Sequence, residues 1–126
     1  MSEPVFLTIE QVKTLHRLAL ERSGGQDGVR DAATLESAVM HPFNVWLYGQ
    51  GDLFDIAAAY AFHLSQAQAF IDGNKRTGMA AALVFLEGNG LSVPQATDEL
   101  YAAMIAVAER HMDKPGLAAL FRGLSQ

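Results

Sequence analysis

Residues 68–78 read Gln-Ala-Phe-Ile-Asp-Gly-Asn-Lys-Arg-Thr-Gly, and this stretch separates two long apolar segments of the chain. The pair Asp72-Gly73 is typical of a helix break, and the amides from Asn74 onward are expected to open the next helix. The first N–H groups of a helix have no partner within it and carry the positive end of its dipole. The stretch therefore predicts two helices joined by a short turn, with an anion-binding helix start after the turn.

Charged residues surround this expected helix start. Lys75 and Arg76 add two positive charges, and Asn74 adds a neutral donor, a combination that suits phosphate. Asp72 would repel a phosphate bound alone, but it fits if magnesium bridges the carboxylate and the phosphates. The residues thus predict a nucleotide–magnesium site. A capped helix start with a solvated Lys-Arg pair is the alternative.

Two apolar helices are expected on either side of the stretch. The preceding helix is predicted over about 52–69, with Asp52 as its cap. Residues 56–64 within it are apolar on every side except at His63. The following helix is predicted over about 74–87 and ends at a Gly-Asn-Gly sequence, which is a strong C-terminal stop. A helix that is apolar all round belongs in the middle of a bundle, so these two helices should form the core.

The outer parts of the chain carry helix-start and helix-stop signals. Thr8 and Gln11 have the spacing of a capping box, and the glycines at 24–25 should end the helix that they begin. Thr97 and Asp113 are the expected caps of the last two helices. Because the chain shows no clear alternating strand pattern, the sequence predicts an all-α, compact bundle of about six helices.

The second helix is expected to begin at Asp31 and to stop near His41, because Pro42 pushes its predecessor out of helical geometry. The segment 42–51, Pro-Phe-Asn-Val-Trp-Leu-Tyr-Gly-Gln-Gly, is aromatic, short and bounded by glycine. We therefore expect a short extended flap there. Its aromatic residues, Trp46 among them, should either cover the bundle or contact a partner.

Composition limits the possible function classes. The chain has 126 residues, enough for one domain, and it has no cysteine, which excludes disulfides, thiolate nucleophiles and zinc–cysteine or iron–sulfur sites. Nine Lys+Arg against fourteen Asp+Glu give a net charge of -5, the wrong sign for a broad nucleic-acid-binding face. The N-terminus lacks a signal-peptide pattern, and the longest apolar run, 79–86, is far below the roughly 20 residues of a membrane span. We expect a single cytoplasmic domain over 1–126 that binds neither nucleic acid nor a membrane.

The stretch 70–76 resembles the signature of the Fic/Doc family, His-x-Phe-x-Asp/Glu/Asn-Gly/Ala-Asn-Gly/Lys-Arg, which joins two central helices. Lys75 and Met79 stand where the AMP-transferring branch has Gly and a second Arg, so the resemblance points to the Doc branch. It implies a Fic-fold toxin of a toxin–antitoxin pair, with a flap near 42–51 that pairs with the target. Six positions match the signature: Phe70, Asp72, Gly73, Asn74, Lys75 and Arg76.

The resemblance also implies a reaction. Phosphate, or a nucleotidyl group, would pass from ATP with magnesium to a hydroxyl of a bacterial translation protein, the elongation factor that delivers aminoacyl-tRNA. Asp72 would ligate the magnesium, while Gly73, Asn74 and Lys75 would cradle the phosphates. Arg76 would neutralise the charge that develops during transfer, with Lys75 beside it. A cognate antitoxin with a disordered segment would inhibit by folding into a groove near the site.

Gln68 stands where the family has its catalytic histidine, and Ala69 replaces the proline that often follows. A neutral amide cannot take a proton near neutral pH, and losing a general base typically costs roughly 10²–10⁴-fold in rate. His63 lies about 140° around the same helix from Gln68, so it should face elsewhere. It is expected to be a buried, hydrogen-bonded core residue. His41, followed by Pro and Phe, imitates the start of the signature but lacks its continuation, so it is treated as a decoy. His111 is expected to be structural. A catalytically silent nucleotide-binding module is therefore the alternative to an enzyme, and a purely structural partner is a third possibility.

Overall fold

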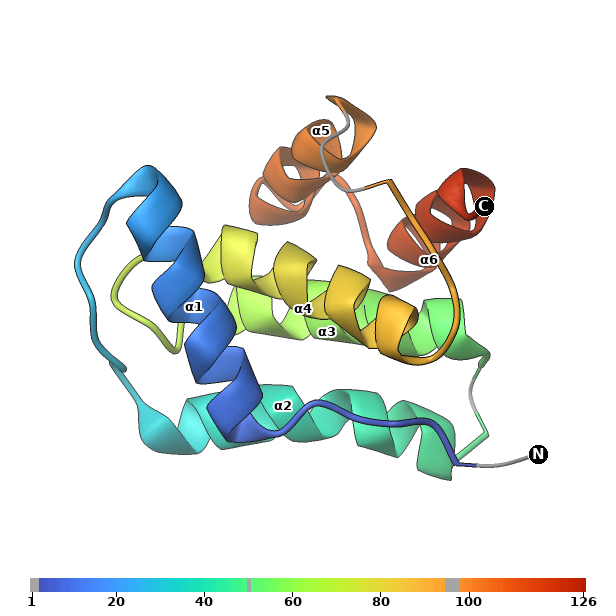
Figure 1. Ribbon diagram of the computed structural model, residues 1–126, viewed down its shortest axis with the longest axis horizontal. Coiled ribbons are helices and arrows are strands. Elements are labelled where there is room, and N and C mark those ends of the chain that lie inside the picture. The colour runs from blue at the N-terminus through green and yellow to red at the C-terminus, as the bar shows by residue number, and fades with distance from the viewer. Residues whose placement is uncertain (1–2, 50, 95–97) are drawn as a thin grey trace.

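The computed structural model describes residues 3–49, 51–94 and 98–126, and within them the chain forms six helices and no named strand (Figure 1). No helix in these ranges is both long and apolar enough to cross a membrane. The all-α prediction is confirmed, although Thr97, the expected cap of the fifth helix, lies outside the described residues. The helices are α1 (Ile9–Ser23), α2 (Ala32–Leu47), α3 (Leu53–Ala67), α4 (Asn74–Gly88), α5 (Asp98–Ala108) and α6 (Lys114–Leu124).

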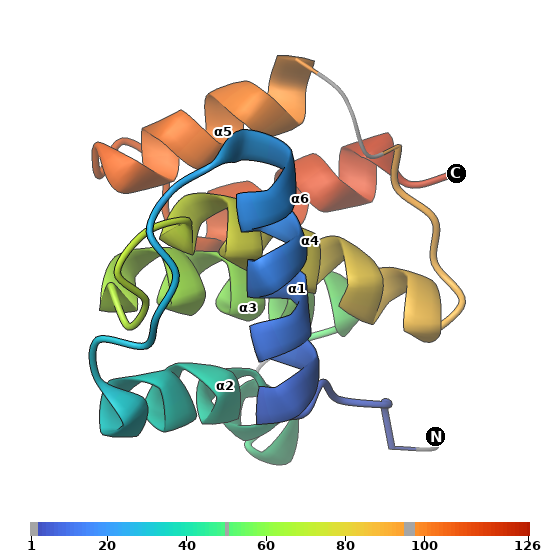
Figure 2. The ribbon, with the colours of Figure 1, turned by 60° about the vertical axis from the view of Figure 1, so that its left-hand side comes forward.

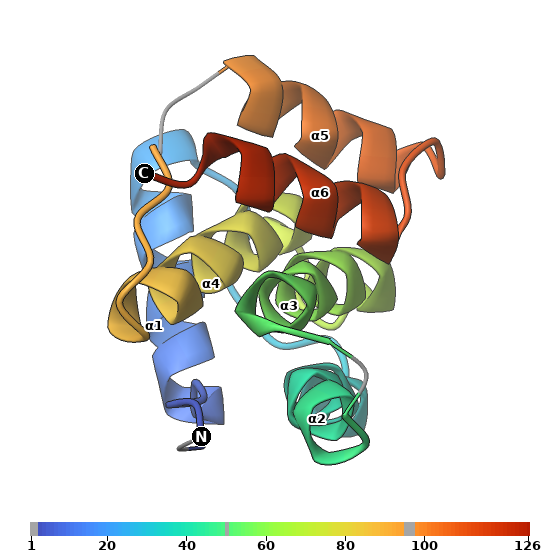
Figure 3. The same ribbon diagram turned by 90° about the vertical axis from the view of Figure 1, so that its right-hand side faces the viewer.

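Helix α3 lies in the middle of the bundle, in contact with α2, α4, α5 and α6 (Figure 3). Every side chain from Ile56 to Ala61 is at most 4% exposed, which confirms the prediction of a helix buried on all sides. The hydroxyl of Tyr60 accepts a hydrogen bond from the Leu7 N–H at 2.9 Å, which ties the N-terminal segment to this core. Burial raises the pKa of Tyr60 to about 12, so this hydroxyl stays neutral.

Helices α3 and α4 run antiparallel and pack closely (Figure 1). A Cβ atom at Gly78 would lie only 2.7 Å from the backbone oxygen of Ala61, so only glycine allows this approach. The close pairing fixes the turn between the two helices at one end of the core. The small buried residues of the two helices include Ala57, Ala58, Ala81 and Ala82.

The predicted N-caps are present wherever the structure describes them. Thr8 and Gln11 form the capping box of α1, and Asp31 accepts a hydrogen bond from the Thr34 N–H at the start of α2. The same N–H lowers the pKa of the Asp31 carboxyl. Asp52 and Asp113 cap α3 and α6 through their side chains. These helix starts follow from residues within one turn of each other.

The expected end of α2 at His41 is wrong, and so is the expected flap at 42–51. Helix α2 continues through the buried Pro42 to Leu47. A proline costs a helix one hydrogen bond, but the turns beyond it gain aromatic packing. The ring of Phe6 lies 5.3 Å from that of Phe43 and 6.0 Å from that of Trp46. Trp46 therefore covers the bundle from a helix rather than from an extended segment.

An extended segment lies instead in the loop between α1 and α2, next to the turn before α4 (Figure 2). The Arg30 N–H donates to the Ala69 oxygen at 2.7 Å, and the Ile71 N–H donates to the Gly28 oxygen at 3.0 Å. These bonds form an isolated antiparallel bridge between Val29 and Phe70. The α1–α2 loop, residues 24–31, is thus fastened along residues 69–71.

Candidate functional site

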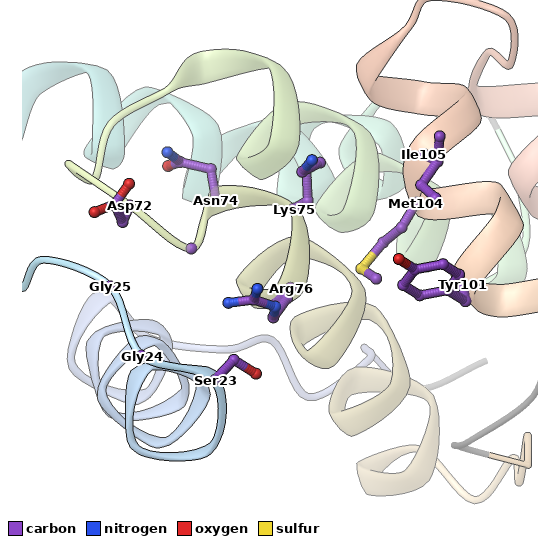
Figure 4. A pocket seen from close by; sticks show the side chains of 11 residues that line it. Ser23, Gly24, Gly25, Asp72, Asn74, Lys75, Arg76, Tyr101, Met104 and Ile105 are labelled. Atoms are coloured by element: carbon purple, nitrogen blue, oxygen red, sulfur yellow. The ribbon is translucent and has the colours of Figure 1, made fainter.

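A cavity of about 390 Å³ opens at the N-terminal end of α4 (Figure 4). Residues 72–76 line it from the turn and the first helical residues of α4. Residues 23–25, at the end of α1, form one wall, and Tyr101 and Met104 of α5 lie on another. The cavity therefore gathers segments from three parts of the sequence around the start of one helix.

The start of α4 has no side-chain cap. Its N-cap residue is Gly73, with φ 81° and ψ 15°, and the helical ladder begins where the Thr77 N–H donates to the Gly73 oxygen. In the described part of the chain, nothing accepts from the N–H groups of Asn74, Lys75 and Arg76. These groups and the helix dipole favour an anion, as the sequence predicted.

Two cations lie at this helix start. Lys75 and Arg76 are both exposed, and neither has a carboxylate within 4.0 Å among the residues that the structure describes. Figure 4 shows the Arg76 guanidinium on the side of the cavity where Asp72 and Ser23 lie. Unpaired cations next to unpaired N–H groups are suited to a ligand with several negative oxygens, such as a polyphosphate.

The Asp72 carboxylate is exposed at the edge of the cavity, and its Oδ2 accepts a hydrogen bond from the Gln26 N–H at 2.7 Å. Among the described residues no group of three or more Asp, Glu or His side chains could hold a metal together. A single carboxylate fits magnesium, which is commonly held by one or two carboxylates, waters and the phosphates of its ligand. Asp72 is the carboxylate that lines this cavity.

The side chain of Asn74 is buried and closes the turn. Its Oδ1 accepts from the Phe70 N–H at 3.0 Å, and its Nδ2 donates to the Phe70 oxygen at 2.9 Å. These two bonds hold Phe70, which is itself 1% exposed, as an anchor under the turn. Only the side chain of Asn74 takes part in these bonds, so its backbone N–H remains without a partner at the helix start among the described residues.

His16 of α1 is a site residue that the sequence analysis missed. It is 2% exposed, and its Nε2 lies 2.7 Å from the backbone oxygen of Asp72. A signal was present, because His16 follows Val12 by four residues and shares its helix face. Both are buried in α1. A polar residue on that apolar face needs a hydrogen-bond partner, and the turn before α4 supplies it.

Gln68 lies outside the lining of the cavity. It follows α3 in a left-handed conformation with φ 54°, and its Nε2 donates to the Ser65 oxygen at 3.1 Å. The side chain is exposed and bonds to the end of its own helix. The structure therefore separates Gln68 from the other site residues, which it brings together at the start of α4.

His63 lies outside the lining of the cavity. It is half-buried, its ring stacks on that of His41 at 3.9 Å, and its Nε2 accepts from Lys114 Nζ at 3.0 Å. Burial, with help from the charges of His41 and Lys114, lowers the pKa of His63 to about 4. This imidazole is neutral at pH 7 and joins α3 to α2 and α6.

The chain is similar to known proteins over most of its length. A model of the Fic/DOC family matches residues 6–86, which span α1 to most of α4. The chain is 37% identical over 125 residues to "Toxin Doc" of Mycolicibacterium smegmatis, covering 95% of this chain and 93% of that protein. It is 33% identical over 85 residues to "Protein kinase doc" of Escherichia phage P1, covering 67% of this chain and 68% of that protein. The chain belongs to the Fic/DOC family.

Proposed function

We propose that this protein is the toxin of a toxin–antitoxin pair and transfers the terminal phosphoryl group of ATP to a hydroxyl of another protein. The observation that carries the proposal is the uncapped start of α4, where unpaired N–H groups and two unpaired cations line one cavity with Asp72. The names of two relatives, a toxin and a protein kinase, favour the same reading. Transfer of a nucleotidyl group is the variant of this reaction that the family also suggests.

The anion-binding groups of the site support phosphoryl transfer. That reaction depends on positioning and on stabilising charge spread over the phosphoryl oxygens. The N–H groups of residues 73–76 and the Lys75 ammonium would hold the phosphates, and Arg76 would neutralise the charge that develops. Magnesium, when bound, would supply further neutralisation through the phosphate oxygens, with Asp72 as its protein ligand.

We further propose that the acceptor is a component of the translation machinery, the elongation factor that delivers aminoacyl-tRNA. The antitoxin would bind through a disordered segment that folds on the toxin. A second cavity of about 390 Å³ supports this mode, because it runs between α1, α4 and α5 and shares Arg76 with the first. Its lining is largely apolar, including Leu15, Met79 and Leu83. A helix with one apolar face would fit such a groove.

The test is transfer from labelled ATP to the purified elongation factor, in parallel with label on the γ- or the α-phosphate. We expect label from the γ-phosphate only, and we expect the double variant Lys75→Ala/Arg76→Ala to abolish it. The matched control is Lys13→Ala/Arg17→Ala, which removes two charges from α1 at residues that line neither cavity. Label from the α-phosphate would indicate nucleotidyl transfer. Absence of label with either nucleotide would contradict an ATP-dependent transferase.

A catalytically silent module that acts by holding a nucleotide is the second candidate. It is favoured by one observation: the cavity has no imidazole among its described lining residues, and Gln68 is bonded to Ser65 instead. Binding of ATP that depends on Lys75 and Arg76, without transfer, would support this candidate. The variant Gln68→His should then gain roughly 10²–10⁴-fold in transfer rate if only the general base is missing. A purely structural partner would show no binding that depends on these two residues.

A further inference from the structure

The imidazole of His16 lies directly beneath the turn that precedes α4. Its Nε2 is 2.7 Å from the Asp72 oxygen, and its ring stacks on Phe70 with a centroid distance of 3.8 Å and an interplanar angle of 8°. A Cβ atom on Gly73 would lie 3.5 Å from His16 Cδ2. Because a carbonyl oxygen can only accept, Nε2 must carry the proton of this hydrogen bond.

This hydrogen bond fixes the orientation of one peptide group. In a trans peptide the C=O and the next N–H point in opposite directions, and no cis peptide is present among the described residues. The Asp72 oxygen points to the buried His16, so the Gly73 N–H must point away from His16. Gly73 itself lines the cavity. In the described structure this N–H donates to no other group.

We propose that His16 is a positioning residue that holds the Gly73 N–H toward the bound phosphate. Glycine at position 73, with φ 81°, tolerates both orientations of the peptide before it. If that peptide turned over, the Asp72 oxygen would take the place of the N–H and would repel a phosphate. The His16 donor prevents this turn. The inference rests on the proposed function, since it concerns the same phosphate site.

The surroundings of His16 hold the ring in one orientation. Phe70 covers one face of it and is itself held by the two hydrogen bonds of Asn74. On the other edge, Nδ1 lies 3.8 Å from Oδ1 of Asp27, a side chain that is 71% exposed. Packing alone would not need a polar group here, because an apolar side chain fills space without the desolvation cost of an imidazole. The buried donor is therefore explained by its acceptor on the turn.

The experiment compares two replacements that differ in the donor. In His16→Gln the amide Nε2 is as many bonds from Cα as the imidazole Nε2, while His16→Met has a similar shape and no donor. Both lose the ring stacked on Phe70. We expect ATP–magnesium to bind the Gln variant within about threefold of native. We expect binding to the Met variant to be about tenfold weaker, as for one lost hydrogen bond to a charged ligand. Titration calorimetry measures both dissociation constants.

A second readout needs no nucleotide. In ¹H–¹⁵N spectra of the free proteins, loss of the ring should shift the Gly73 amide in both variants. We expect one sharp Gly73 signal in the Gln variant and a broadened or doubled signal in the Met variant. Equal binding losses in the two variants, or a Gly73 signal as sharp and single in the Met variant as in the Gln variant, would overturn the positioning role. If native protein binds no ATP, the proposed function fails and the Gly73 amide still decides the role of His16. Should the Met variant not fold, the ¹⁵N shifts of the His16 imidazole in the native protein test the positioning role. A proton on Nδ1 alone would refute that role, because Nε2 could then not donate to the Asp72 oxygen.

Discussion

The starts of α3 and α4 are built in opposite ways. Asp52 precedes α3 in an extended conformation, and its Oδ1 accepts from the N–H groups of Phe54 and Asp55 at 3.0 and 3.1 Å. The Asp55 carboxylate accepts a hydrogen bond from the Asp52 N–H, and Arg122 of α6 lies 3.0 Å from the Asp52 carboxylate. At the start of α4 the corresponding residue is Gly73, which has no side chain to offer.

The difference shows how one physical feature serves two purposes. Both helix starts expose N–H groups and a positive dipole end. At α3 the chain satisfies them with its own carboxylates, so the end contributes to stability. At α4 the side chains of Asn74 and His16 form hydrogen bonds with the backbone of the turn. In the described structure, the N–H groups at the helix start remain free for a ligand. The comparison therefore separates residues that stabilise the fold from residues that bind.

The largest expected effect comes from giving α4 a carboxylate like that of α3. Gly73→Asp places a negative charge among the free N–H groups, whereas Gly73→Asn has nearly the same shape and no charge. Asn and Asp are among the residues that best tolerate a positive φ, and a Cβ here meets only ordinary contacts. We expect ATP to bind the Asp variant at least ~100-fold more weakly than the Asn variant, a difference of about 3 kcal/mol.

Titration calorimetry checks this prediction, and urea unfolding of both variants checks their stability. The two free energies of unfolding should agree within about 1 kcal/mol, because the strain of a positive φ is common to both. Equal affinities for ATP would show that the start of α4 is not where the phosphates bind.

The next effect should come from removing the cap of α3. Asp52→Ala leaves two N–H groups without their acceptor, so the free energy of unfolding should fall by about 1–2 kcal/mol. Asp52→Asn keeps a capping oxygen and loses only the charge pair with Arg122, whose partly exposed groups contribute about 0–1 kcal/mol. Urea unfolding at pH 7 measures both. ATP affinity should stay within about twofold of native, and a larger loss would break the separation drawn above.

The third effect concerns a second lysine at a helix start. Lys114 is the first residue of α6, and Lys75 lies in a similar place near the start of α4. Lys114 differs because its Nζ donates a hydrogen bond to the neutral ring of His63. The pKa of His63 is about 4 in the folded protein against an ordinary 6.5, so the unfolded chain binds the extra proton first. The contribution of His63 to the free energy of unfolding is therefore fully present above pH 6.5 and is lost as the pH falls toward 4.

We expect the free energy of unfolding to fall by about 1–2 kcal/mol from this group between pH 7 and pH 4, since solvent screens a half-buried ring. Urea unfolding across this range measures the loss. His63→Gln should flatten the profile, and the exposed His111 supplies the control variant His111→Gln, which should keep it. A native slope in the His63→Gln variant would assign the titration to another group.

Sequence alone predicted the features that depend on neighbours in the chain. The capping box of Thr8 and Gln11 and the caps at Asp52 and Asp113 are set within three residues, and the structure contains all of them. The helix break at Asp72-Gly73 and the helix start at Asn74 were predicted for the same reason. The apolar character of residues 56–64 was sufficient to place α3 in the core, because a helix apolar on all sides cannot lie at the surface.

The features that sequence did not predict depend on distant contacts. The turns of α2 beyond Pro42 are stabilised by Phe6, which precedes the first helix. His16 meets Asp72 across 56 residues, and nothing local marks that pair. Gln68 turns back to Ser65 because α3 ends at Ala67, two residues before the expected end. Element boundaries are thus where tertiary contacts override local preference.

The α1–α2 loop has a consequence for how this protein tolerates change. Its bonds to residues 69–71 use only backbone atoms, and the side chains of Val29 and Arg30 are exposed. Saturation mutagenesis should therefore find these two positions open to most amino acids. Proline at position 30 is the exception, because it removes the N–H that meets Ala69. The side chains of this loop can change while the turn that its backbone holds keeps its shape.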